Sequence, residues 1–281
     1  MKIPPRNPTP NEILETVTRL IAMTKWSHWS HLARNENARR NLITFMEKGC
    51  PRIDDGEIVV HTTLSDGEEL ARGILGKDFL TIAQAEQVNS FSFTESARIN
   101  LALTVPNSET LVWLQNEGYV LTPTLSEDCH LLQYLLQYLS LSDPGFCPKV
   151  ERWFARAPQA FSRKDVMKSC RWLAVRKELY PQSQNKPLRG QRKLLTAMEY
   201  VPSAVEMMYV IGTYYKVHGV CLFKKVRVRT SSVDVSGQSV LVGDTNIDGP
   251  KVYDFSDNEC KEYVGLSSAL KLETNLDALN T

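Results

Sequence analysis

The spacing of apolar residues changes along this chain of 281 residues, and the change limits the folds that the chain can adopt. Near the start, Leu14, Val17 and Ile21 recur at the spacing of one helical face. From residue 206 to residue 255, short apolar runs are separated by turn sequences, a pattern typical of strands. We therefore predict an α+β fold: a helical N-terminal region, a mixed middle region, and a basic helix and loop followed by a small antiparallel β domain.

Local signals place the individual elements. Thr9 as N-cap, Pro10 in the first turn and Glu12 in a capping box predict a helix over residues 10–32. Apolar spacing predicts further helices at 35–48, 65–74, 81–88, 94–103, 109–116, 130–141, 162–180 and 258–272. Alternation and turn residues predict strands at 56–64, 208–212, 220–230, 239–244 and 251–255. Proline, glycine and asparagine predict a loop at 181–193.

Composition is that of a soluble globular protein, with 42% hydrophobic and 23% charged residues. We find no apolar stretch long enough to span a membrane and no secretory signal. The six cysteines are scattered without a CxxC pair, which fits a reducing cytoplasm and argues against a zinc ribbon or a disulfide framework. We therefore expect a cytoplasmic protein that needs no membrane, metal or cofactor.

Charge is strongly segregated, although the net charge of the whole chain is only +1. Residues 149–229 contain 18 lysines and arginines but five acidic residues, a net charge of +13, while the remainder carries −12. The change falls near Asp143–Pro148, so we predict two domains, 1–147 and 148–281. Such segregation is expected of a protein that binds a polyanion, although a solvated basic face without a ligand remains an alternative.

The most unusual stretch is the predicted strand at 220–230. Successive side chains of a strand point to opposite faces, so Lys225, Arg227 and Arg229 are expected to share one face with Phe223. Three cations at this spacing suit the phosphates of a nucleic-acid backbone. The alternative is a solubilising edge strand, since lysines on sheet edges oppose aggregation.

Further cations fall into two groups. The first group is Lys164, Lys168, Arg171 and Lys216. We predict that these four residues contact the nucleic-acid backbone, as do the strand cations Lys225, Arg227 and Arg229. The other group, Arg189, Arg192 and Lys193, lies on the predicted basic loop. A loop rich in glycine and proline can enter a groove of DNA, so we predict that this group reads bases.

No motif of a known hydrolase, nucleotide-binding loop or zinc enzyme occurs in the chain, so we predict no catalytic residue and no metal site. One histidine, His218, suggests an alternative function in catalysis. His218 precedes a glycine in the basic region, and a group that titrates near neutrality can serve metal-independent RNA cleavage. A ribonuclease that uses His218 therefore stays open, although one histidine beside a turn glycine is more often structural.

Two segments carry a resemblance to a known family. The first is SFSFTESARINLALTVPNSETLVWL at 90–114. The second, at 194–235, has Leu194, Leu195 and Pro202, an apolar strand at 208–211, a K-x-H-G turn at 216–219, a further strand and a stretch similar to V-x-x-S-x-D. Together they resemble the PAM-reading large subunit of plasmid-borne type IV CRISPR complexes. The resemblance covers under a third of the chain. The chain lacks the four cysteines of the family's zinc finger, and its helical N-terminus has no counterpart in the family.

The resemblance implies a non-catalytic subunit of an RNA-guided effector complex. Such a subunit caps the guide-RNA filament, reads a short duplex motif beside the target and helps to open the strands. Its implied partners are double-stranded DNA, guide RNA and other protein subunits of a ribonucleoprotein complex. Arg189, Arg192 or Lys193 would then read bases, and the strand cations would hold phosphates.

A further class of protein, a DNA-binding regulator, also remains open. An autonomous DNA-binding regulator would use residues 162–180 as a recognition helix and residues 206–255 as a β wing.

Overall fold

The computed structural model of the chain describes residues 52–54, 57–59, 65–130, 134, 164–234, 236–246 and 249–272. The chain forms two compact units, one of residues 62–272 and one of residues 1–61 with 273–281. The described part of the latter is an antiparallel hairpin of β1 (Arg52–Asp54) and β2 (Glu57–Val59). β2 confirms part of the strand predicted at 56–64. The helices predicted at 10–32 and 35–48 lie outside the described residues.

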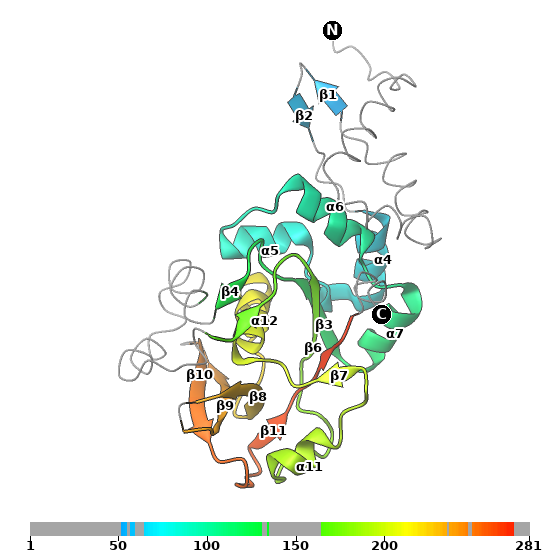
Figure 1. Cartoon of the computed structure of the whole chain (residues 1–281). Coiled ribbons are helices and arrows are strands. Elements are labelled where there is room, and N and C mark those ends of the chain that lie inside the picture. Colours follow the sequence, from blue (N-terminus) through cyan, green and yellow to red (C-terminus); the bar gives the residue numbers. More distant parts are fainter. Residues whose placement is uncertain are drawn as a thin grey trace, which may run out of the picture. The chain divides into compact units, whose positions relative to one another are not determined.

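Four short helices open the larger unit (Figure 1): α4 (Asp66–Leu75), α5 (Ile82–Asn89), α6 (Glu95–Leu103) and α7 (Ser108–Asn116). A single turn of 3₁₀ helix, Gly76–Asp78, links α4 to α5. Each of the four begins after a Ser, Thr or Asn whose side chain accepts a hydrogen bond from the third backbone N–H of the helix. Ser65 and Thr81 complete capping boxes. The four helices predicted between residues 65 and 116 are confirmed.

The first sheet is antiparallel, with strand order β3-β6-β12-β7. Its strands are β3 (Tyr119–Pro123), β6 (Trp172–Arg176), β12 (Ala269–Leu270) and β7 (Glu199–Tyr200). Helices α4, α6 and α7 cover one face through Ala71, Leu101 and Leu111, among others, which share a core cluster with Trp172 of β6. The other face packs on a further helix, so β3 is buried along its whole length and shows no apolar–polar alternation.

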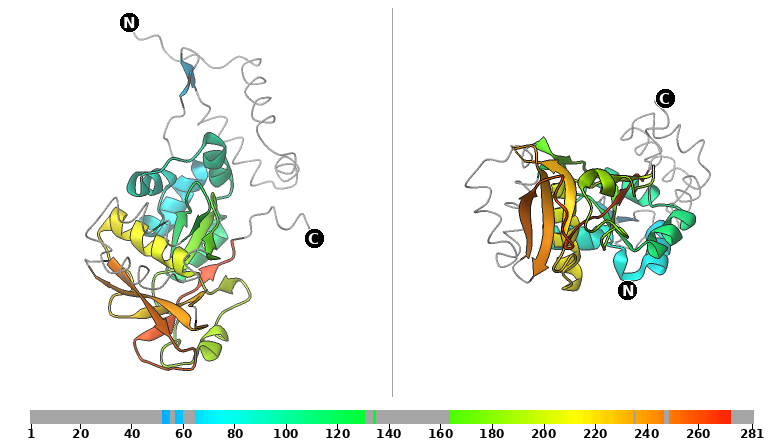
Figure 2. Two further views of the ribbon diagram at one scale, coloured as in Figure 1. Left: turned by 60° about the vertical axis from the view of Figure 1, so that its left-hand side comes forward. Right: turned by 90° about the horizontal axis from the view of Figure 1, so that it is seen from below.

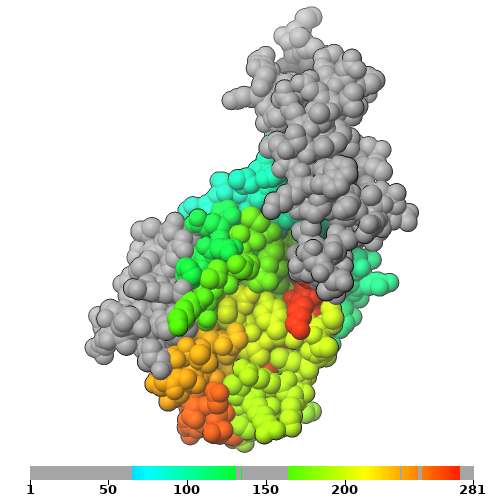
Figure 3. All heavy atoms as spheres, in the orientation of Figure 1, coloured from blue at the N-terminus to red at the C-terminus, as the bar shows by residue number. Residues whose placement is uncertain are grey.

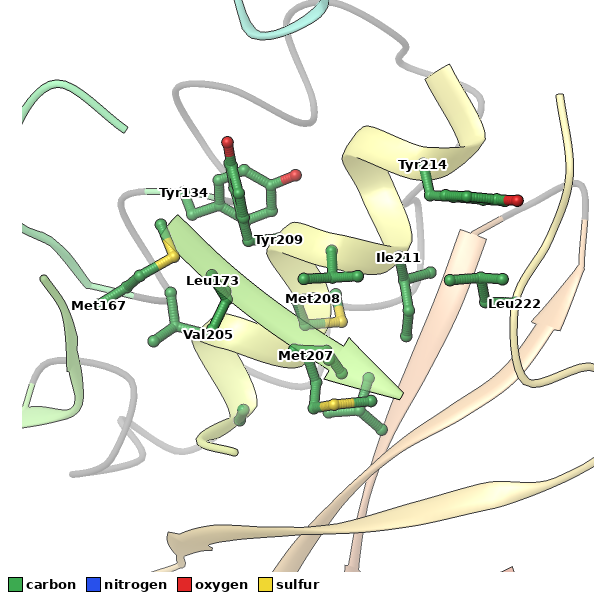
Figure 4. Close-up of a cluster of buried hydrophobic side chains, with 14 of the residues drawn as sticks. Tyr134, Met167, Leu173, Val205, Met207, Met208, Tyr209, Ile211, Tyr214 and Leu222 are labelled. Carbon is green, nitrogen blue, oxygen red and sulfur yellow. The ribbon is translucent and has the colours of Figure 1, made fainter. Parts of the chain in front are cut away.

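That further helix is α12 (Ala204–His218), which begins with a capping box of Ser203 and Glu206 and ends at the left-handed Gly219. It is buried from residue 204 to residue 214. Figure 4 shows Met207, Met208 and Ile211 packed among neighbouring apolar side chains in this core. The strand predicted at 208–212 is therefore wrong. A helix buried on all sides has a continuous apolar run rather than a stripe, and such a run resembles a buried strand.

The second sheet packs on α12 and has strand order β10-β9-β8-β11 (Figure 2). Strands β8 (Arg227–Val233), β9 (Ser239–Asn246) and β10 (Gly249–Phe255) are antiparallel, and β11 (Val264–Leu266) runs parallel to β8. The strands predicted at 239–244 and 251–255 are confirmed. The strand predicted at 220–230 begins only at Arg227, because residues 221–226 form a turn with positive φ at Phe223 and Lys225.

Two predicted helices are wrong. Residues 162–180 contain β5 (Val166–Met167), which pairs with β4 (Cys129–His130), and β6, whose apolar run is buried on both faces of the first sheet. Residues 258–272 contain β11 and β12. Of the helix predicted at 130–141, His130 belongs to β4 and most other residues lie outside the described ranges.

Strands from both sides of the predicted domain boundary at 143–148 pair with each other. β3 pairs with β6, and β4 pairs with β5. The compact unit 62–272 therefore runs across the boundary, whose own residues are outside the described ranges. The predicted α+β class is confirmed, with helices mainly in the N-terminal part of this unit and strands mainly in the C-terminal part. None of the helices in the described ranges is long and apolar enough to cross a membrane.

Gly243 in β9 is essential to the second sheet. Its φ is 145°, and a Cβ atom there would collide with the backbone oxygen of Val226. We expect Gly243→Ala to lower the free energy of unfolding by about 2 kcal/mol, because backbone would have to move. In the matched control Gly73→Ala, the new Cβ atom in α4 meets nothing within 4 Å, so stability should rise by about 0.5–1 kcal/mol. Urea unfolding measures both, and equal effects would contradict the assigned backbone geometry.

Candidate nucleic-acid interface

Two of the three predicted base-reading cations, Arg189 and Arg192, lie on a short helix, and the third, Lys193, is the residue that follows it. Part of the predicted loop 181–193 forms α11 (Leu188–Arg192). Leu188 and Gln191, three positions apart, point inward and are 5% and 0% exposed. Gln191 Nε2 donates to the Ser183 carbonyl at 2.8 Å, which fixes α11 to the preceding turn. Arg189 and Arg192 therefore project outward from a helix of defined position rather than from a free loop.

α11 forms one wall of a groove. The backbone N–H of Leu188 donates to the carbonyl of Asp257 at 2.9 Å, which joins α11 to the segment after β10. The groove between them has a volume of about 490 Å³. Its lining residues are Leu188, Arg189, Arg192, Lys193, Asp257 and Asn258. In Figure 3 this region lies at the lower end of the view, where the yellow-green atoms of α11 meet orange atoms of the later segment.

The cations of the groove are not neutralised by the protein. Arg189, Arg192 and Lys193 are exposed, and their side chains form no ion pair or hydrogen bond within the described ranges. Asp257 lies in the same groove, but its ion-pair partner is Arg229, with 3.8 Å between Nη1 and Oδ1. Three uncompensated positive charges around one hollow produce a local field that attracts anions.

Arg229 does not belong to an exposed row of cations, which corrects the predicted phosphate contact. Its side chain is completely buried on β8. Nη1 donates to the carbonyl of Ser256 at 3.1 Å, and Nη2 donates to the carbonyl of Glu259 at 2.6 Å. Burial lowers the pKa of Arg229 below its ordinary value, an effect that the Asp257 carboxylate opposes. The side chain holds the segment after β10 in place, so it is unavailable to phosphate.

The other two cations of the predicted row, Lys225 and Arg227, do not lie side by side on one strand face. Arg227 lies with its guanidinium 3.7 Å from the ring centroid of Tyr253 and 5.0 Å from that of Tyr263. Asp244 lies nearby: burial would raise the pKa of its carboxyl, but hydrogen bonds from Tyr253 and Lys251 outweigh burial and hold it below its usual value. Lys225 is exposed, but it lies on the turn before β8 with φ 59°. The predicted face of Lys225, Arg227 and Arg229 does not form.

Two cations predicted on a helix face at 162–180 are engaged in ion pairs. Lys168 contacts Asp128 at 2.8 Å, and Arg171 contacts Glu206 at 2.6 Å. The second pair joins the segment before β6 to the first turn of α12, so it has a structural role. Because these residues lie between short strands, they share no recognition helix, and the form of the regulator hypothesis that needs one is excluded.

The two remaining predicted phosphate contacts differ from each other. Lys216, in the last turn of α12, donates to the carbonyl of Val88 at 3.0 Å and thereby ties α12 to α5. Lys164 is exposed and forms no ion pair or hydrogen bond with other residues in the described ranges. Of the ten predicted site residues, the structure brings together Arg189, Arg192 and Lys193 in one hollow.

His218 lies at the C-terminal end of α12, with its ring 4.7 Å from the ring of Tyr214. Its Nε2 atom is buried and has no hydrogen-bond partner among the described residues. The Tyr214 hydroxyl is occupied, because it donates to Asp78 at 2.9 Å. The described surroundings of His218 therefore supply no acid–base partner. Among those residues, no group of three or more metal-ligating side chains forms.

Sequence reasoning did not identify Asp257 and Asn258 as site residues. Their sequence, SDN directly after a strand, was a turn signal that could have marked a loop. Their position opposite α11 depends on hydrogen bonds between segments about 70 residues apart, which no local pattern reveals.

Comparisons with protein-family models, with curated proteins and with solved structures gave no match to this chain.

Proposed function

We propose that this chain is a non-catalytic nucleic-acid-binding protein and that the groove beside α11 is its contact surface. The observation that carries the proposal is the grouping of Arg189, Arg192 and Lys193 around one hollow without neutralising partners. Guanidinium groups bind phosphate oxygens through paired N–H donors, and exposed cations gain affinity by releasing counterions from the nucleic acid. Among the other described cations of this region, seven make contacts within the fold: Lys168, Arg171, Arg176, Lys177, Lys216, Arg227 and Arg229. We therefore assign the proposed contact to the groove beside α11.

The narrower form of the proposal rests on the resemblance to the PAM-reading subunit of type IV CRISPR complexes. In this form the chain is a cytoplasmic subunit of an RNA-guided complex, with double-stranded DNA, guide RNA and other protein subunits as partners. One feature of that resemblance departs from expectation, because the apolar run at 208–211 is helical. The narrower form is tested by purification of the chain from its native host, where guide RNA and partner subunits should co-purify.

The general proposal is tested by binding to labelled single-stranded and double-stranded oligonucleotides at about 50 and about 200 mM salt. We expect binding that weakens as salt increases. Arg189→Ala combined with Arg192→Ala removes two phosphate contacts, so the log–log salt slope for single strands should fall by about 1.4. Over this fourfold range of salt, the variant should lose about sevenfold less affinity than the unsubstituted protein.

The matched control is Arg72→Ala combined with Lys77→Ala, which removes the same charge from an exposed part of the same unit. Its salt slope should equal that of the unsubstituted protein. Equal slopes for all three proteins would mean that the groove is a solvated surface. Absence of binding even at low salt would refute nucleic-acid binding altogether.

A further inference from the structure

The groove beside α11 has two chemically different walls. Arg189, Arg192 and Lys193 form the basic wall. The opposite wall carries the Asp257 carboxylate and the Asn258 amide. Asp257 Oδ1 accepts from the Ser239 hydroxyl and lies 3.8 Å from Arg229 Nη1, which leaves Oδ2 without a contact among the described residues. A bound phosphate alone would gain nothing from this second oxygen, because a carboxylate repels phosphate. The acidic wall therefore indicates a ligand that also carries hydrogen-bond donors.

The position of the acidic wall is fixed by the fold. The Asp257 backbone carbonyl accepts from Leu188, and its carboxylate accepts from the Ser239 hydroxyl. Arg229 holds the carbonyls on both sides of Asp257, those of Ser256 and Glu259. These contacts place the carboxylate before any ligand arrives, as expected of a recognition group. They also explain how it remains in the groove without pairing with the exposed cations of the other wall.

We propose that the groove binds one unpaired nucleotide of a single strand, with its phosphate on the basic wall and an exocyclic amino group of its base on Asp257. This inference rests on the proposed function and names the ligand of the same site. Carboxylates accept hydrogen bonds from the N4 amino group of cytosine, whereas uracil presents a carbonyl oxygen at that position. The groove therefore discriminates cytosine from uracil, and Asn258 is the second polar group available to the base edge.

The size of the groove supports an unpaired nucleotide over a duplex. Its volume of about 490 Å³ is within the range of about 300–1,000 Å³ that is usual for sites of small ligands. The reading groups line a hollow, whereas reading of a duplex requires an element that protrudes into the major groove. α11 has five residues and lies beside the wall of Asp257 rather than projecting alone. A hollow of this size can take one unpaired base, whereas a stacked base pair cannot enter it.

The test compares the affinities of the full chain for oligo(dC) and oligo(dU) of equal length in a slightly alkaline buffer. These strands differ in the amino or carbonyl group and in the adjacent ring nitrogen. We expect oligo(dC) to bind at least about fivefold more tightly. Asp257→Asn removes a repelling charge and supplies an amide that both donates and accepts. Both strands should then bind more tightly, and the ratio of their affinities should fall to about one.

Two controls complete the experiment. Asp254→Asn makes the same charge change at an exposed position of β10 and should keep the preference for oligo(dC). A strand of 2-pyrimidinone nucleotides lacks the amino group and adds no bulk, so it should bind the unsubstituted protein about as weakly as oligo(dU). This arm tests the contact even if Asp257→Asn fails to fold.

The outcomes separate this inference from the proposed function. Equal, salt-dependent binding of both strands would overturn the amino-group contact and leave nucleic-acid binding intact. The amino-group contact would also be overturned if Asp257→Asn kept the preference for oligo(dC). The same holds if the 2-pyrimidinone strand bound the unsubstituted protein as tightly as oligo(dC). Binding of duplex DNA with no binding of single strands would exclude an unpaired nucleotide, and no binding of any strand would remove the proposed function as well.

Discussion

Arg229→Ala should lower the free energy of unfolding by about 4 kcal/mol. Each hydrogen bond from a charged donor contributes about 1.5–3 kcal/mol, and Arg229 makes two to backbone carbonyls in a completely buried position. Truncation leaves the carbonyls of Ser256 and Glu259 without their donor and opens a cavity under the segment after β10. Urea unfolding with linear extrapolation measures the loss.

Two further variants make this prediction specific. Arg229→Lys keeps the charge but lacks the guanidinium fork, so it should lose about 2 kcal/mol. Ser231→Ala, two residues along the same strand and exposed, should change stability by less than about 0.5 kcal/mol. A loss below about 1 kcal/mol for Arg229→Ala would mean that the side chain is solvated, and its assignment as a phosphate contact would return.

Local sequence signals predicted the elements whose stability is local. The helices α4 and α5 begin at capping boxes, in which Ser65 and Thr81 exchange hydrogen bonds with the helix three residues later. The hairpin of β9 and β10 has a short apolar run on either side of a turn sequence. In these segments the residues that decide the structure lie within a few positions of one another, so sequence patterns identify them.

Apolar periodicity gave the wrong secondary structure for two elements that are buried on both sides, α12 and β6. α12 and β6 are covered on both faces by other elements, so neither shows the periodicity of its own geometry. For α12 a decisive signal was present, namely the capping box of Ser203 and Glu206 and the C-terminal Gly219. For β6 no comparable local signal exists, because its neighbours β3 and β12 lie about 50 and 100 residues away.

The candidate site was predicted in part for the same reason. Arg189, Arg192 and Lys193 are close in sequence and exposed, so their grouping required no knowledge of the fold. The role of Arg229 could not be predicted, because its guanidinium donates to carbonyl groups some 30 residues away. These hydrogen bonds make it a structural residue rather than the predicted ligand contact. Asp257 joins the site through the same contacts.

The second large effect concerns a buried carboxylate in the first sheet. Glu199 on β7 is 6% exposed. Its Oε1 accepts from Tyr119 at 2.6 Å and from Ser268 at 2.7 Å, and its Oε2 accepts from the backbone and hydroxyl of Thr196 at 3.0 and 2.9 Å. Burial would raise the pKa of Glu199, but these donors together outweigh burial and hold the pKa below its usual value. The network joins β7, β3 and the residue before β12.

Glu199→Gln should therefore cost about 3 kcal/mol at pH 7, because the amide offers one acceptor oxygen to several buried donors. The cost should depend on pH. A carboxyl whose pKa is lower in the folded state than its unfolded value of about 4.5 stabilises the fold above that value, and the stabilisation is lost as pH falls through the folded pKa. The difference between the unsubstituted protein and the variant should thus be constant above about pH 5 and shrink at lower pH.

Denaturant unfolding of both proteins at a series of pH values measures this difference, and taking the difference cancels the titration of groups common to both. Glu262→Gln, at an exposed position before β11, should show almost no difference at any pH. A difference for Glu199→Gln that grows as pH falls would mean that the folded pKa is raised and that the carboxyl is neutral in the fold. A difference that stays constant down to pH 3 would mean that the network does not depend on the charge, since the hydroxyl groups of Tyr119 and Ser268 would then be satisfied equally well by an uncharged acceptor.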